Sequence, residues 1–580
     1  MRTTLLKKLN LKSLLQKALP APRYTLSQRI KISISFFIFL LIFPLSSLGA
    51  VSSNTIKIHP IDSPLYDAIQ YLYILEGKSL PSTAGPYSND ELVLMFNSIN
   101  KKELDAKTLP TYQYIENELT KELSPFSIHA KVSLEAYLHT NPEDFTTNAD
   151  WNYNYEARKP FLSIPLEISL HNFFYAHMEV VFGNPKYLEG IGPTKGRSPL
   201  YGIYPFTTNL LHFWRSEETP LDGTMPHLGF VAVGGTGWNL VVGRDKISWG
   251  PGTTGNLVLS DHVQYHNMAR FTAYTNTFKY TLLTSFFPHP DEIHAPPPYT
   301  QARELMGLKM FMAYRLEWRL FKEKLGLAVT EGIMYQSKEG ILDLRVFNPF
   351  IIYHNYYIRS MSNSLLALEL NYTPISALNI YGQIAIDEFE SSKEKSGTNV
   401  HPNAMGYMVG ATYVLPYKQG LFYGNIEGVY TDPYLYLRSV HGHKSQSTEP
   451  EDTLNFVVAL RRWALKSVVY DQYFMGYPYG GDAIIGNLSF GYKEYGRWAV
   501  TGNLFYMLHG EKEMNSLWLL DTNESTPTEV GTHYIDIGVT SSVYLFERMQ
   551  LYGGLNWLAN FKEGVALHDV QLSMGISYTL

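Results

Sequence analysis

Cysteine is absent from the 580-residue sequence, so disulfide bridges and thiolate metal sites are excluded. Charged residues are also scarce, at 17% of the chain, compared with roughly 25% in soluble proteins. The glycines Gly250, Gly252 and Gly255 do not stand between a strand and a helix, as a phosphate-binding loop would require. No G-x-S-x-G pattern marks a hydrolase nucleophile. The sequence therefore offers no motif for nucleotide binding or for a serine hydrolase.

Acidic residues are absent from the first 50 residues. An apolar run from Ile32 to Phe43 is followed by small residues at Ser47 and at Gly49 or Ala50, where cleavage is plausible. This run is well short of the roughly 20 residues that a membrane-spanning helix needs. We therefore predict that residues 1–50 are a signal peptide for export. The basic residues that precede the apolar run are Arg2, Lys7, Lys8, Lys12, Lys17, Arg23, Arg29 and Lys31.

The exported part of the chain is acidic. The whole chain has 47 basic and 53 acidic residues, and removing the eight basic residues of the leader leaves 39 against 53, a formal charge of −14. Because nucleic-acid binding needs a basic stripe, this charge argues against a nucleic-acid partner.

Residues 60–125 contain three helical patterns. The first begins with Ser63 as a candidate N-cap before a proline, and ends at Gly77. The second begins at Ser88 and has a glutamate three residues later, which is typical of a capping box. The third spans 111–123 and is closed by a proline. We predict a small helical bundle, which could close one mouth of a larger structure.

Alternation with period two replaces the helical patterns from Ser127 onward. The chain ends "VQLSMGISYTL", in which apolar residues from Val570 to Leu580 alternate with small or polar ones, so a strand there has one apolar and one polar face. Aromatic residues, including 43 tyrosines, make up 14% of the chain and favour strands and membrane-interface girdles. Similar segments are "HYIDIGVTSSVYLF", "QLYGGLNWLANF", "GLAVTEGIMY", "NIYGQIAIDEF", "LFYGNIEGVY" and "AVTGNLFYML".

Short and long connections mostly alternate between these segments. Outer-membrane barrels have short periplasmic turns and long outer loops, and lipid contacts their apolar faces. We therefore predict an all-β transmembrane barrel of about 18 antiparallel strands, within a range of 18 to 20. Residues 127–580 would form the barrel and residues 51–126 a periplasmic α-helical bundle. The short links are 234–237, 321–324, 373–377, 416–420, 494–497 and 546–549, and the long ones 184–227, 246–267, 288–307, 336–363, 390–403, 439–453 and 509–532.

Candidate ligand-binding residues cluster between Gly237 and Asp261. Arg244 and Asp245 stand at a strand end and Trp249 follows, so the three could hold a sugar by stacking and by charge-assisted hydrogen bonds. In the structural alternative, Arg244 pairs with carboxylates in the lumen and Trp249 packs the loop into the barrel mouth. The glycines around residue 251 predict a tight turn that approaches other backbone closely.

The stretch "VVGRDKISWGPGTTGNLVLSD", residues 241–261, resembles the signature of the Wzi-type capsule assembly family. Supporting similarities occur in family order at "VTEGIMY", "NPFIIYHN", "LNIYGQIAIDEF" and "GYPYGGDA". The resemblance implies an 18-stranded outer-membrane barrel with a periplasmic helical bundle and lectin-like binding of an exported glycan. The last strand also resembles the C-terminal signature of outer-membrane barrels, although it ends on Leu580 rather than on an aromatic residue.

Other polar clusters have simpler interpretations. The histidines of "HGHK", His441 and His443, and of "PHPDEIH", His289 and His294 with Asp291, lack an identifiable third or fourth metal ligand, so we expect solvated loop residues. The carboxylates Asp387, Glu388 and Glu390 could run glycoside hydrolysis if held at the right separation, but an acidic rim is expected instead.

The prediction is therefore a non-enzymatic, monomeric outer-membrane barrel without a cofactor or metal. It binds and anchors capsular or other surface polysaccharide at the cell surface, with its N-terminal helices in the periplasm and its long loops outside. The predicted ligand-binding residues are Arg244, Asp245, Trp249 and Asp261. The alternative is a porin or transport channel for small solutes, and an outer-membrane hydrolase is the third possibility.

Overall fold

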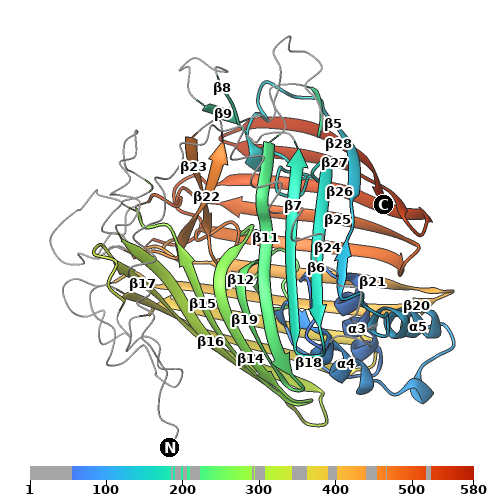
Figure 1. Ribbon diagram of the computed structural model, residues 1–580. Helices are drawn as coiled ribbons and strands as arrows, with labels where there is room; N and C mark the ends of the chain where they lie inside the picture. Colours follow the sequence, from blue (N-terminus) through green and yellow to red (C-terminus); the bar gives the residue numbers. More distant parts are fainter. Residues whose placement is uncertain are drawn as a thin grey trace, which may run out of the picture. The chain divides into compact units, whose positions relative to one another are not determined.

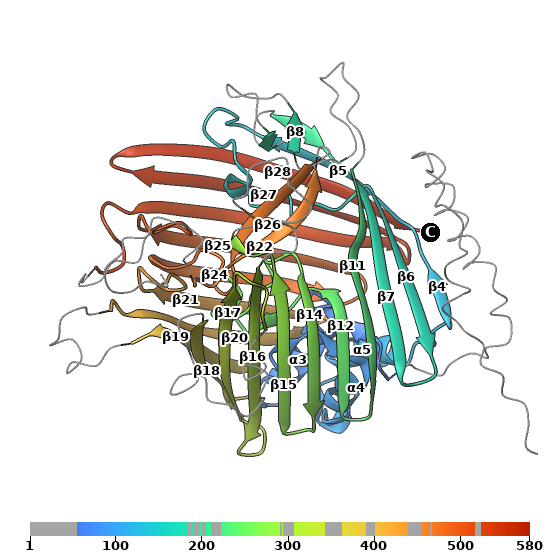
Figure 2. The same ribbon diagram turned by 60° about the vertical axis from the view of Figure 1, so that its left-hand side comes forward.

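A closed wall of 18 antiparallel strands forms the body of the molecule (Figures 1 and 2). Residues Ala50–Leu580 make one compact unit, which contains both this wall and the helices. The computed structural model describes residues 55–183, 187–189, 197–199, 205–209, 222–290, 293, 307–342, 362–389, 401–438, 454–464, 467–516 and 524–580. The predicted signal peptide, 1–50, lies outside these residues.

The wall strands run in sequence order, and each pairs with the next. The first and last strands, β5 and β28, close the ring, in a register from Gln571 opposite His139 to Thr579 opposite Lys131. The wall strands have the bounds β5 Lys131–His139, β6 Leu162–Leu170, β7 Phe174–Gly183, β11 Asp222–Gly235, β12 Trp238–Asp245, β14 His266–Tyr274, β15 Phe278–Phe287, β16 Leu308–Leu320, β17 Leu325–Ser337, β18 Ser362–Ile375, β19 Leu378–Glu388, β20 Ala404–Tyr417, β21 Gly420–Thr431, β24 Ala483–Glu494, β25 Trp498–His509, β26 Thr532–Phe546, β27 Met549–Lys562 and β28 Val565–Thr579.

Two three-residue strands also join the sheet at its first strands. Strand β4, Phe126–Ile128, pairs with β6, while β10, Phe206–Thr208, pairs with the second half of β5. The direct pairing between β5 and β6 is limited to Lys131 and Val132 of β5. Between β5 and β7 the wall is therefore completed in part by the connecting segments.

The outward face of the wall is apolar, as the alternating pattern predicts. In β28, Met574 and Tyr578 are exposed, whereas Gln571 and Ser577 point inward and are buried. In β26, Ile537 and Val539 are exposed on either side of the buried Gly538. A soluble protein would not cover its surface with such strands, and hydrocarbon is the solvent that suits them. The prediction of an all-β barrel is confirmed.

Short turns and long connections alternate around the wall. The predicted short links all join neighbouring wall strands, for example 321–324 between β16 and β17 and 494–497 between β24 and β25. The predicted long loop 439–453 lies outside the described residues. The connection from β21 to β24 is longer than that prediction. It contains a separate hairpin of β22, Val457–Ala464, and β23, Ser467–Phe474. The wall has 18 strands, as predicted.

The three predicted helices are present. Helix α3, Pro64–Leu75, has Ser63 as its N-cap; α4, Asn89–Asn97, begins at Ser88; and α5 spans Leu109–Leu119. The Ser88 side chain accepts a hydrogen bond from the Glu91 amide, but the Glu91 carboxylate does not complete a capping box. It contacts the Lys279 ammonium of β15 at 2.6 Å. None of the helices in the described part of the chain is long and apolar enough to cross a membrane.

The helices lie at the end of the barrel where the short turns are (Figure 1). The amide of Ala377, in the turn after β18, donates to the Ile74 carbonyl of α3 (2.9 Å). The Asp67 carboxylate of α3 accepts from Lys493 at 2.7 Å, and the rings of Tyr114 and Tyr495 stack. In both views the hairpin β22–β23 lies on the other side of the barrel from these helices.

A hydrophobic core lies inside the wall. It combines residues of the N-terminal region, of the connection after β12, of the connection after β21 and of the inner faces of wall strands. Side chains of the wall cannot fill a barrel of this size by themselves; here chain segments enter the lumen and bury one another. Members of this core include Ile56, Ile58, Ala84, Ile247, Trp249, Leu257, Leu259, Tyr434, Leu435, Tyr436 and Phe456.

Candidate functional site

The connection between β12 and β14, residues 246–265, folds into the barrel, and we call it the inner loop. Its strand β13, Ser248–Trp249, pairs with β2, Ala84–Gly85, of the N-terminal region. The amide of Gly250 donates to the Thr83 carbonyl at 2.7 Å. The inner loop enters from the long-loop end and the N-terminal region from the opposite end. Their contact therefore crosses the lumen.

A wall carboxylate holds the tip of the inner loop. The Glu427 side chain of β21 accepts from the amides of Thr253 (2.8 Å) and Thr254 (2.9 Å) and from the Tyr381 hydroxyl (2.7 Å). The Leu257 amide donates to the Gln383 side chain at 3.0 Å. Hydrogen bonds to a charged acceptor are the stronger class, and these lie in a buried site. They fix the loop in one position against β19 and β21.

The predicted tight turn is present. Gly250 has φ +137°, and a Cβ there would lie 1.9 Å from the Gln383 amide nitrogen. A Cβ at Gly252 would lie 1.9 Å from the Gly255 carbonyl oxygen. Only glycine fits such approaches, so the glycines serve close packing of the loop inside the barrel.

Buried charges hold the N-terminal region from the other side. The Arg315 guanidinium of β16 pairs with Glu317 (3.1 Å) and with Glu369 of β18 (3.0 Å), and also donates to the Thr83 hydroxyl (2.6 Å). Glu317 accepts from the Ser82 hydroxyl at 2.8 Å. These side chains bind residues 82–84 to the wall beside β2.

The first two predicted binding residues have different neighbours. The Arg244 guanidinium stacks over the Tyr265 ring at 4.0 Å, and its Nε donates to Asn267 (3.0 Å). The neighbouring Asp245 is buried, and its carboxylate accepts from the Lys246 amide (2.9 Å). Arg244 therefore packs on an aromatic ring of the inner loop.

The other two predicted residues have opposite environments. Trp249 has 0% exposure and packs in the lumen core, so in this conformation it offers no face to a ligand. Asp261 is exposed at the far end of the inner loop. The four predicted residues thus do not form one open site.

The weaker clusters have structural roles where they are described. His289 is buried, whereas Asp291, His294, His441, His443 and Glu390 lie outside the described residues. Asp387 is buried and accepts from the Asn363 amide group (2.8 Å) and the Tyr436 amide (3.0 Å), while Glu388 lies 3.7 Å from Arg438. Across the described ranges, no group of three histidines or carboxylates could hold a metal ion.

Histidine in the inner loop is neutral at physiological pH. Burial lowers the pKa of His262 to about 4, and its Nε2 lies 2.7 Å from the Phe474 carbonyl oxygen. The Tyr265 hydroxyl donates to the Arg461 carbonyl at 2.9 Å. Both contacts join the inner loop to the hairpin β22–β23, so the two segments form one structure at the long-loop end.

Sequence reasoning did not identify the segment "WNYNYEAR", residues 151–158, in the connection from β5 to β6. The buried Glu135 of β5 accepts from the hydroxyls of Tyr153 (2.8 Å) and Tyr552 (2.7 Å) and from the Lys159 amide (2.9 Å). The alternation of aromatic and amide residues could have signalled a segment suited to sugars.

No protein-family model matches the sequence, and no curated protein matches it. Among solved structures, the chain is similar to Wzi of Escherichia coli, described as an outer-membrane protein involved in group 1 capsule assembly and as a carbohydrate-binding β-barrel. The TM-score is 0.56 at 12% identity, over 91% of this chain and 99% of that one. OccK1 (OpdK) of Pseudomonas aeruginosa has a TM-score of 0.38 at 9% identity, over 78% of this chain and 98% of that one. The first likeness supports the fold of an outer-membrane barrel.

Proposed function

We propose that this chain is an outer-membrane barrel of the Wzi type that binds exported polysaccharide and anchors it at the cell surface. The observation that carries the proposal is the lumen filled from both ends, by the inner loop and by residues 82–84. A barrel of this kind presents a fixed outer surface and does not need an open channel.

The membrane location rests on the wall itself. Its exposed residues are apolar along whole strands, and its backbone groups are paired around a closed ring. Both properties are those that hydrocarbon demands. The short turns would then face the periplasm together with the helices, and the long connections would face outward.

The long-loop end is the part that would meet polysaccharide. Arg244, stacked on Tyr265, and the exposed Asp261 remain candidates for sugar contact there. Trp249 and Asp245 would support the loop from within, because both are buried. The carbohydrate binding stated for Wzi supports this assignment by similarity of fold.

The porin alternative makes a different electrical prediction. A filled lumen should leave the wild-type protein nearly silent in planar lipid bilayers, whereas a porin gives stable open-channel steps. The buried contacts of Glu427 and Arg315 are the reason that we favour the silent barrel.

Binding of polysaccharide by the purified protein tests the proposal. Full-length protein in detergent should bind surface polysaccharide extracted from the bacterium that produces it, and should bind less of an unrelated polymer of equal length. Absence of binding, together with open-channel steps in bilayers, would replace the anchor with a channel.

A further inference from the structure

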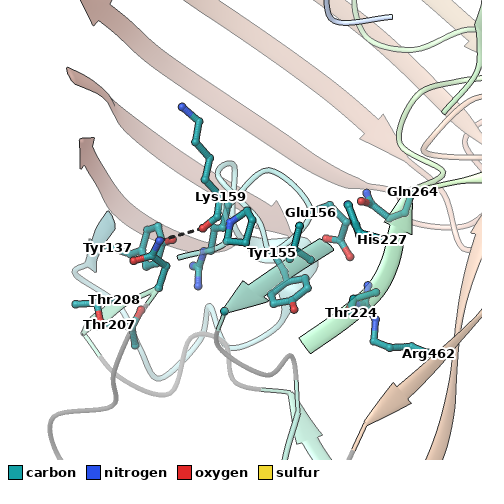
Figure 3. Close-up of a pocket in the computed structure, with 15 residues that line it drawn as sticks. Tyr137, Tyr155, Glu156, Lys159, Thr207, Thr208, Thr224, His227, Gln264 and Arg462 are labelled. Carbon is teal, nitrogen blue, oxygen red and sulfur yellow. Dashed lines mark hydrogen bonds between the residues drawn. The ribbon is translucent and has the colours of Figure 1, made fainter. Parts of the chain in front are cut away.

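A cavity of about 110 Å³ lies at the long-loop end, apart from the predicted residues (Figure 3). A cavity needs roughly 10–15 Å³ by this measure to hold one water, so several waters fit and a sugar unit could replace them. Segments far apart in sequence meet there: 155–160 after β5, 207–209, the start of β11, the inner loop and the hairpin β22–β23.

Two arginines from different segments contribute to the lining. The Arg158 guanidinium stacks over the rings of Tyr137 (3.9 Å) and Trp151 (4.8 Å). Arg462, in β22, has its Nε 3.3 Å from the Asp471 carboxylate. A guanidinium carries five N–H donors in a planar fork, so this one contact leaves Arg462 with capacity for a second carboxylate.

The aromatic ring of Tyr155 is part of the cavity lining. Figure 3 shows Tyr155 between Tyr137 and Thr208 on one side and His227 and Gln264 on the other. The Arg462 guanidinium lies 5.4 Å from the centroid of the Tyr155 ring. A cation beside an aromatic face can hold a carboxylate next to a stacked ring.

The remaining lining supplies polar groups from ordered elements. Thr207, on β10, and Gln264, in the inner loop, are both buried. The Asn209 side chain donates to the carbonyl of Lys159 (3.0 Å), which fixes the segment that carries Tyr155. Glu156 is the one carboxylate of the lining, and it accepts from the Tyr473 hydroxyl at 3.4 Å. Such a lining can orient the hydroxyl groups of a bound sugar without reorganising.

We propose that this cavity binds a carboxylated sugar unit, of the uronic-acid class, with Arg462 on the carboxylate and Tyr155 against the sugar ring. The proposal rests on the proposed function and names the chemical class of the polysaccharide. The cations come from two segments that meet only in the folded barrel, and each is held beside an aromatic ring. A neutral sugar would offer no anion to the Arg462 donors that do not contact Asp471.

The experiment compares acidic and neutral sugars on full-length protein in detergent. The probes are a short galacturonate oligosaccharide and the galactose oligosaccharide of the same length, measured by calorimetry at low and high salt. We expect tighter binding of the acidic probe, weakened by salt. Arg462→Gln should lower affinity for the acidic probe about tenfold, as expected for one charge-assisted contact, and should change the affinity for the neutral probe little.

Two further variants make the result specific. Tyr155→Leu should lower the affinity for both probes, because stacking of a sugar on the tyrosine ring does not depend on charge. Lys562→Gln removes a cation from the outer turn between β27 and β28, where Lys562 pairs with Glu511 outside the cavity, and should change neither affinity. If Arg462→Gln lowers the melting temperature, the Tyr155→Leu result alone tests whether the cavity is the site.

Equal binding of both probes, or equal loss of both in Arg462→Gln, would overturn the assignment of an acidic sugar and leave the surface anchor intact. Binding that is unaffected in both variants would place the sugar elsewhere. Failure to bind any glycan, including the native polymer, would contradict the proposed function itself.

Discussion

At the scale of single residues, glycine decides whether the inner loop can occupy the lumen. Gly252 lies where a Cβ would be 1.9 Å from the Gly255 carbonyl oxygen and 2.9 Å from the Met408 sulfur. Neither neighbour can move far, since one is backbone and the other packs in the lumen core. The turn therefore depends on the absence of one methyl group.

Gly252→Ala should loosen the inner loop, at a cost of about 1–3 kcal/mol for the overpacked turn. The expected result is faster hydrogen exchange at the amides of Thr253 and Thr254, which are bonded to Glu427. Gly424→Ala is the matched control, because a Cβ there has no atom within 4 Å. Equal exchange in both variants would mean that the loop is not held as described.

The sequence predicted the glycine turn but not the burial of Trp249. Closely spaced glycines around a proline are a local signal, and local sequence determines a turn. The burial of Trp249 depends on Ala84, which lies more than 160 positions away in the chain. The cavity beside Tyr155 was missed for the same reason, since its lining comes from seven separate segments.

At the scale of elements, the wall strands are defined by the contrast between their two faces. Ile426, in the middle of β21, is 61% exposed, whereas the neighbouring Asn425 and Glu427 are buried in the lumen. Val565 is similarly exposed, at 60%, but starts β28 at the outer turn. The two positions differ in depth along the barrel rather than in exposure.

Ile426→Arg should destabilise the barrel by about 2–4 kcal/mol, the cost of a cation at the bilayer midplane, and Val565→Arg by no more than about 1 kcal/mol. Folding into lipid vesicles, followed by heat-dependent gel migration, measures both. If the two variants behave alike, hydrocarbon does not surround β21.

The buried charges of β15, β16 and β18 hold the N-terminal region in the barrel. Arg315 lies between Glu317 and Glu369, and Lys279 contacts Glu91 of α4. Removing one partner of a buried pair leaves the other charge without compensation, which costs about 3–5 kcal/mol. The contact of residues 82–84 with the wall is therefore sensitive to a single cation.

Arg315→Met should release residues 82–84, seen as faster hydrogen exchange there and as current steps in planar bilayers that the wild type lacks. Arg497→Met is the control, since Arg497 is at the same end of the barrel, is exposed and has Glu494 as its ion-pair partner. A silent Arg315→Met bilayer with unchanged exchange would show that this cation does not hold the region.

Strand positions could be predicted because apolar residues, which face outward, alternate along each strand with small or polar residues, which face inward. The hairpin β22–β23 was not predicted, since neither of its segments shows the alternation of the wall strands. What distinguishes it is its partner: β22 and β23 pair with each other and not with β21 or β24. The sequence of a single segment does not show with which other strand that segment pairs.

At the scale of the whole molecule, the two ends of the barrel are closed by different parts of the chain. The helices and residues 82–84 occupy the short-turn end, and the inner loop and the hairpin β22–β23 occupy the other. Ala84 of the N-terminal region and the inner loop meet in one core around Trp249. Such a molecule is built to hold a surface in place, which suits anchoring better than transport.

Retention of polysaccharide on living cells tests this account most directly. A strain without the gene should make the same total amount of surface polysaccharide but release much of it into the medium, and the wild-type gene should restore the cell-bound fraction. Unchanged retention in the deleted strain, with full-length protein verified in the outer membrane of the parent, would contradict the account.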